Sequence, residues 1–110
     1  MATLLAACAM PQAPGYYEGI IPEGRDRERV VRVRLEPDGR ASVSTARWGS
    51  STDPAEGTWK AAADRRVVVD LMSTPAQRLV FQHGGDLLVA KEWDKSVWGD
   101  RGPGTLYRVR

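Results

Sequence analysis

Residues with reactive side chains are scarce in this chain. Its 110 residues include one histidine, His83, and one cysteine, Cys8. A soft-metal site or a Ser-His-Asp triad requires several such groups together, and neither a Gly-x-Ser-x-Gly elbow nor a phosphate-binding loop occurs. His83 stands before Gly84, where we expect an exposed residue at the end of a strand. The sequence predicts no catalytic residue, no metal and no cofactor, and therefore favours a protein that is not an enzyme.

The residues around Cys8 form the most specific local pattern. Residues 1–7 are small or apolar, and Leu5-Ala6-Ala7-Cys8 looks like a bacterial lipobox. In such signals a peptidase cuts before the cysteine, whose thiol carries a diacylglycerol and whose new amino group is usually acylated. We predict lipidation of Cys8, with residues 1–7 as the remnant of a truncated signal, because no Lys or Arg precedes Cys8 and the apolar stretch is short. The alternative is an alanine-rich tail that contains a cysteine by chance.

Residues 8–14 are expected to tether a domain to a membrane. They are polar and contain two prolines, which is typical of a short, semi-extended linker. Two or more acyl chains give stable anchoring, and Ala9 rather than Asp after the cysteine favours sorting to the Gram-negative outer membrane. We expect the protein on that membrane, facing the periplasm.

The charges exclude one class of partner. Sixteen Lys and Arg stand against fourteen Asp and Glu, and the two signs alternate, as in residues 23–29. A nucleic-acid-binding surface would need clustered basic residues with aromatic side chains among them. No nucleic acid is therefore expected as a partner, and the sequence does not indicate an oligomeric state.

Residues 15–110 predict an all-β domain. Apolar residues recur with period two and are interrupted by turn residues, giving eight short strands. We expect a small eight-stranded antiparallel up-and-down barrel, lipocalin-like, in which the last strand pairs with the first; a β-sandwich is the alternative. The residues expected on the inner face are Tyr17, Gly19, Ile21, Val31, Val33, Leu35, Ala41, Val43, Thr45, Trp59, Val67, Val69, Leu71, Leu79, Phe81, Tyr107 and Val109.

The expected connections differ between the two ends of this barrel. Short turns lie at the end nearer the tether: Pro37 to Gly39, Ala61 to Arg65, and Gly84 to Asp86. Longer loops lie at the other, distal end: Pro22 to Arg29, Trp48 to Ala55, Met72 to Ala76, and Glu92 to Gly104. Because binding residues concentrate on loops held by a rigid scaffold, the distal end is the candidate binding surface. Its candidate residues are Trp48, Trp93, Trp98, Arg25, Arg27 and Arg29.

Trp93 and Trp98 allow two interpretations. Large aromatic side chains in a polar loop can anchor a partner protein, or they can plug the end of the barrel. We expect surface exposure, since charged residues surround both.

Several short motifs, taken in order, resemble the N-terminal domain of NlpE, a family of copper-resistance outer-membrane lipoproteins. They are Gly15-Tyr16-Tyr17-Glu18-Gly19-Ile20-Ile21-Pro22, Asp38-Gly39, Gly57-Thr58-Trp59, Gly85-Asp86-Leu87 and Tyr107-Arg108-Val109. The resemblance implies a lipocalin-like barrel on a lipid anchor, associated with envelope-stress sensing at surfaces and with copper tolerance. That family has a Cys-x-x-Cys pair where this chain has Glu23 and Asp26. Carboxylates are hard ligands without redox chemistry, so we expect no copper site.

Three functions fit these observations. The first is a non-enzymatic, lipid-anchored envelope domain that senses stress or a surface, or contacts another envelope protein. The second is a lipocalin-type binder of a small apolar ligand, which the many inward apolar side chains disfavour because they would fill the lumen. The third is an inhibitor of a host hydrolase such as lysozyme.

Overall fold

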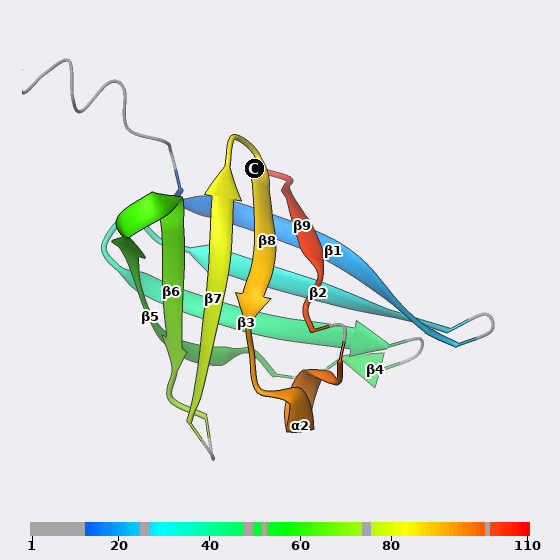
Figure 1. Ribbon diagram of the computed structural model, residues 1–110. Helices are drawn as coiled ribbons and strands as arrows, with labels where there is room; N and C mark the ends of the chain where they lie inside the picture. The colour runs from blue at the N-terminus through cyan, green and yellow to red at the C-terminus, as the bar shows by residue number, and fades with distance from the viewer. Residues whose placement is uncertain (1–12, 25–26, 48–49, 52, 74–75, 101) are drawn as a thin grey trace, which may run out of the picture.

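The computed structural model describes residues 13–24, 27–47, 50–51, 53–73, 76–100 and 102–110. It is a closed, eight-stranded antiparallel β-barrel with almost no helix (Figure 1), as the sequence predicts. The long strands are β1 (Gly15–Gly24), β2 (Arg27–Leu35), β3 (Arg40–Arg47), β5 (Ala55–Ala62), β6 (Arg66–Leu71), β7 (Gln77–Gly84), β8 (Leu87–Glu92) and β9 (Thr105–Arg108). The minor elements are β4 (Ser50–Ser51), the 3₁₀ turn η1 (Ala63–Arg65) and the helix α2 (Lys95–Trp98). No helix among the described residues is long and apolar enough to cross a membrane.

The barrel closes between its first and last strands. β9 pairs with β1 through Glu18 opposite Tyr107, and each remaining strand pairs antiparallel with its neighbour in the meander. β4 adds a short pairing to the end of β3, beyond the segment that pairs with β5. Closure leaves most strands with partners on both sides, which removes the long edges that favour aggregation.

The short turns lie where the sequence predicts. Between β2 and β3, Gly39 adopts a φ of +95°, which glycine accepts without steric cost, and its N–H donates to the Glu36 carbonyl over 3.1 Å. The turns at η1 and at Gly85-Asp86 lie at the same end of the barrel (Figure 1). We call this the short-turn end; the chain enters the barrel there through Ala13 and Pro14.

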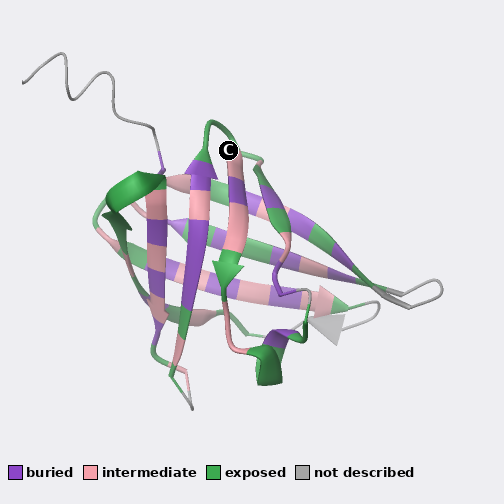
Figure 2. Ribbon diagram, in the orientation of Figure 1, coloured by how far each residue is buried: buried purple, intermediate pink, exposed green. Residues whose placement is uncertain are grey.

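Inward-facing side chains form one apolar core. Buried and exposed bands alternate along the strands (Figure 2), and the core joins residues from every long strand except β5, whose Trp59 packs against it half-buried. The expectation for the last strand is wrong, because Tyr107 and Val109 are exposed. Leu106 and Arg108 point inward instead. Arg108 pairs with the inward-facing Tyr17, and residues directly opposite each other on antiparallel strands lie on the same face of the sheet.

Two expectations about the distal connections are also wrong. Most of the loop expected from Pro22 to Arg29 is strand, since Pro22 pairs with Glu28 and Gly24 with Arg27. Charges of both signs are compatible with such a hairpin because its outer face contacts water. The loop from Glu92 to Gly104 contains α2, a single helical turn too short to produce a periodic pattern.

Candidate functional site

The distal end of the barrel is covered by α2 and the segment that follows it. Asp94 precedes the helix and its carboxylate accepts hydrogen bonds from the backbone N–H of Ser96 at 2.9 Å and from its hydroxyl at 2.6 Å. These bonds hold the pKa of Asp94 below its usual value. Gly99 ends the turn with a φ of +76°. A capped start and a glycine end therefore fix one helical turn across the barrel mouth.

Trp98 projects from this turn into the barrel. Its exposed fraction is 8% and it belongs to the hydrophobic core. The indole N–H donates to Gln77 Oε1 over 3.2 Å, and the guanidinium carbon of Arg29 lies 4.4 Å from the ring centroid. The expectation that Trp98 is exposed is therefore wrong: the helical turn directs Lys95 to solvent and Trp98 to the core.

Trp93 lies at the rim, half-buried against the same core. Its indole N–H donates to the Gly99 carbonyl over 2.8 Å. Gly102, with a φ of +64°, lies directly beneath the ring, where a Cβ would overlap the indole. The loop after α2 thus holds the ring in place, and the ring closes the gap between loop and barrel.

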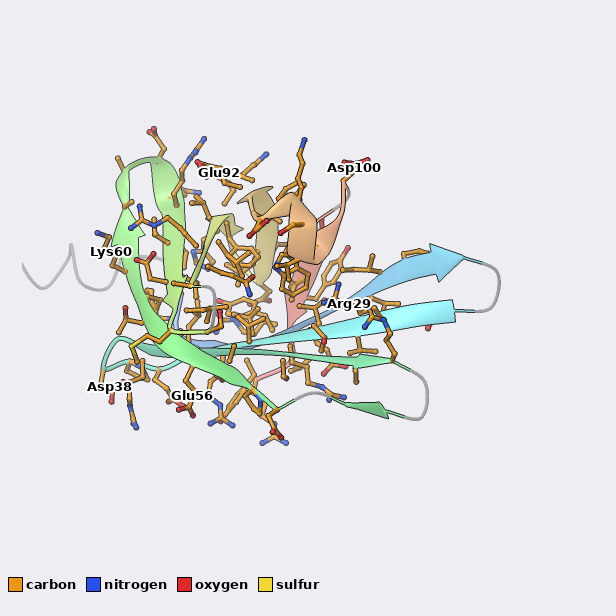
Figure 3. All side chains as sticks on the ribbon, turned by 90° about the horizontal axis from the view of Figure 1, so that it is seen from below. Arg29, Asp38, Glu56, Lys60, Glu92 and Asp100 are labelled. Atoms are coloured by element: carbon orange, nitrogen blue, oxygen red, sulfur yellow. The ribbon has the colours of Figure 1, made fainter. Side chains whose placement is uncertain are left out.

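An open hollow of about 480 Å³ lies against Trp93. Figure 3 shows Glu92 and Asp100 on the same side of the molecule. The residues that line the hollow are Lys91, Glu92, Trp93, Lys95 and Asp100. One indole beside charges of both signs suits a polar protein surface better than an apolar small molecule.

The structure brings together three of the residues proposed from the sequence. Arg29, Trp93 and Trp98 all lie at the distal end. Cys8, Arg25 and Trp48 lie outside the described residues, as does the side chain of Arg27. Sequence reasoning missed Gln77, which contacts Trp98 twenty-one residues along the chain, and Gly102, which packs under Trp93; the Gly102-Pro103-Gly104 run signals only a turn.

Comparison with known proteins adds no relative. No protein-family model matches the chain, and searches of curated proteins and of solved structures also give no match. The resemblance to NlpE therefore stays a prediction.

The short-turn end is closed by a polar network around Arg108. Its guanidinium donates to the Pro14 carbonyl at 2.6 Å, to the Tyr17 hydroxyl at 2.7 Å and to the Asp86 carboxylate at 3.0 Å. The Tyr17 hydroxyl in turn donates to the Ala13 carbonyl at 2.6 Å. Burial raises the pKa of Tyr17, a shift that Arg108 partly opposes. The network fixes the entry of the chain into the barrel.

His83 lies on the inner side of β7, and the expectation that it is exposed is wrong. Its exposed fraction is 3%, and its Nε2 has no hydrogen-bond partner. Leu79, Phe81 and His83 occupy alternate positions of β7 and all face inward. The strand ends at Gly84, one residue beyond the expected end at His83. Burial lowers its pKa, with a smaller contribution in the same direction from Arg108. Within the described ranges, no group of three or more His, Cys, Asp or Glu side chains could hold a metal ion.

Proposed function

We propose that this protein is a non-enzymatic, lipid-anchored domain of the cell envelope that contacts another envelope protein through its distal end. Cys8 is the proposed lipid attachment site. The function is similar to that implied by the NlpE-like motifs, in which a small barrel senses stress or a surface without acting as an enzyme.

The observation that carries this proposal is the filled barrel interior. Six core side chains have an exposed fraction of 0% and pack in one cluster: those of Val31, Val69, Leu79, Phe81, Leu88 and Leu106. A carrier of apolar ligands needs a cavity of several hundred Å³ that encloses most of its ligand. Side chains occupy the space that such a ligand would need, which favours a function performed by the outer surface.

Features of the distal end support it as that surface. The hollow beside Trp93 offers an aromatic ring, a type of side chain enriched at protein interfaces, and Lys91, Lys95 and their acidic neighbours supply the polar rim that such interfaces have. Val97 adds a half-exposed apolar side chain on α2. The capped turn presents these groups in one fixed arrangement, which reduces the entropy lost on binding.

Site-specific photo-crosslinking in cells tests the contact. A photo-reactive amino acid replaces Val97 on α2 or, as a control, Lys60 near the short-turn end. We expect a discrete crosslinked envelope protein from position 97 and none from position 60. Equal labelling at both positions, or no discrete product at position 97, would contradict a distal contact. A product containing a host hydrolase would instead favour the inhibitor alternative.

Fractionation of cells tests the anchor separately. With a full signal sequence supplied, Cys8→Ser should move the protein from the membrane pellet to the soluble periplasm without changing its fold, because the thioether can form only at sulfur. Pelleting that persists after the substitution would contradict lipidation of Cys8.

A further inference from the structure

The outer faces of β1 and β9, together with the residue after β9, carry most of the exposed large apolar side chains among the described residues. Ile20 is 61% exposed, Tyr107 is 59% exposed and Val109 is 56% exposed, with Tyr16 beside them. They lie on neighbouring strands, because Glu18 pairs with Tyr107 and the Val109 N–H donates to the Tyr16 carbonyl over 2.8 Å. Figure 1 shows β1 and β9 side by side on one wall of the barrel. We call these four residues the apolar face.

Arginine side chains border the apolar face. The guanidinium carbon of Arg34 lies 4.7 Å from the centroid of the Tyr16 ring, and that of Arg110, after β9, lies 5.9 Å from it. Arg34 also approaches Glu36 at 3.6 Å. Glu18 lies within the face, between Tyr16 and Ile20 on β1, and pairs there with Arg32 at 3.4 Å. Three arginines stand against two carboxylates, so the face and its border have a small excess of positive charge. Apolar side chains, tyrosines and arginines together are typical of surfaces that bind the headgroup region of a bilayer.

The path of the chain brings this face close to the proposed anchor. Hydrogen bonds from Tyr17 and Arg108 hold the carbonyls of Ala13 and Pro14 at the short-turn end, just before Tyr16. Cys8 precedes Ala13 by five residues, which span at most about 18 Å when fully extended. A domain anchored at Cys8 must therefore keep its short-turn end within that distance of the lipid headgroups.

We infer that the apolar face rests on the anionic lipid surface to which the chain is anchored. This inference rests on the proposed lipidation of Cys8. Tyr16 and Tyr107 insert among the headgroups with Ile20 and Val109, while Arg34 and Arg110 contact lipid phosphates. The contact orients the barrel on the membrane and leaves the distal end, with α2, free for a protein partner.

Hydroxyl-radical footprinting of the tethered protein tests this orientation. Because Cys8 is the chain's single cysteine, the full purified chain can be coupled through it to a maleimide lipid in vesicles. On vesicles containing phosphatidylglycerol, we expect oxidation of Tyr107 to fall severalfold relative to the untethered protein. Trp93, whose half-buried indole lies at the distal end, is the internal control and should keep its rate. Equal protection of Tyr107 and Trp93, or no protection of Tyr107, would overturn the inference.

Substitution of the face provides a second measurement. Ile20→Ser with Tyr107→Ser should restore rapid oxidation at Tyr16 in the tethered protein, and Val97→Ser, which changes an exposed apolar side chain on α2, should not. Phosphatidylcholine vesicles should protect the face less, because they lack the net negative charge. Protection of Tyr107 that depends on protein concentration in the absence of vesicles would assign the face to a second copy of the chain, and would overturn the lipid contact. The Cys8→Ser fractionation tests only the anchor in cells, whereas the footprinting tests only the orientation of the tethered protein. The anchor and the orientation can therefore fail independently.

Discussion

Each tryptophan whose side chain is described combines packing with one directed hydrogen bond. Trp59 donates to the Glu36 carbonyl at 2.7 Å, Trp93 to the Gly99 carbonyl at 2.8 Å, and Trp98 to Gln77 Oε1 at 3.2 Å. The ring contributes buried apolar area, and the satisfied N–H removes the cost of burying a polar group. The contacts of Trp59 and Trp98 connect segments more than twenty residues apart, so composition and spacing could not reveal them.

Replacing Trp98 should destabilise the protein strongly. Trp98→Ala removes a core indole and leaves a cavity, with an expected loss of about 3–5 kcal/mol of unfolding free energy. Urea titration followed by circular dichroism measures this loss. Val97→Ala on the same helical turn removes a half-exposed side chain and should change the unfolding free energy by less than about 1 kcal/mol. A similar midpoint for Trp98→Ala and the native protein would contradict its place in the core.

His83 should make stability depend on pH. Its folded-state pKa lies below the ordinary value of 6.5 because burial disfavours the charged ring. As the pH falls through 6.5, the unfolded chain binds a proton before the folded protein does, and stability therefore decreases until the folded-state pKa is reached. The slope for one proton is at most about 1.4 kcal/mol per pH unit.

The variant His83→Gln isolates this contribution. Carboxylates titrate in both proteins, so the difference between their unfolding free energies reports on the histidine. Urea titrations at about pH 7.5 and about pH 5 should show the native protein losing more stability than the variant. Parallel losses in the two proteins would contradict a buried, neutral His83.

At the scale of elements, the barrel depends on a close approach of β5 and β6. Gly57 pairs with Leu71, and a Cβ at Gly57 would overlap the Asp70 carbonyl oxygen and lie 2.8 Å from its carbon. Both obstructing atoms are backbone, which cannot rotate away as a flexible side chain can. The strands must separate locally to admit any side chain.

Gly57→Ala should therefore cost about 1–3 kcal/mol of unfolding free energy. Gly84 is a matched control in β7, since a Cβ there meets no atom within 4 Å. Gly84→Ala should be neutral or stabilise by up to about 1 kcal/mol, because it reduces the freedom of the unfolded chain. Urea midpoints compare the two variants. An equal change of the midpoint in both would show that the close approach of β5 and β6 does not prevent a side chain at position 57.

The sequence predicted elements well where alternation and turn residues agreed. The inward series in β2, β3 and β6 and the turn at Pro37-Asp38-Gly39 match the structure. It failed where the pattern was ambiguous. In β9, Leu106 and Tyr107 are both suited to a core, and only pairing with β1 decides which one faces inward. The sequence predicts a loop from Pro22 to Arg29, where charges of both signs hide the alternation of a strand, yet most of this segment forms a two-stranded hairpin.

At the scale of the whole molecule, both ends of the barrel are closed and its interior is filled. Arg108 and Tyr17 close the short-turn end, and Trp98 with Arg29 closes the distal end. The sequence could predict a closed barrel because eight short strands follow one another at hairpin spacing. It could not predict the two closures, since each joins residues from strands far apart in the chain.

A filled barrel predicts that the native protein does not bind indole, whereas Trp98→Ala does. The substitution vacates a site of indole shape beside the apolar core, with Gln77 Oε1 available to accept the N–H of the added ligand. Apolar cavities made in this way bind small aromatic molecules, and binding to the folded state alone raises its stability. Added indole should therefore raise the urea midpoint of Trp98→Ala and leave that of the native protein unchanged. Saturable binding of indole by the native protein would instead require an open lumen, and would favour the carrier function over contact through the outer surface.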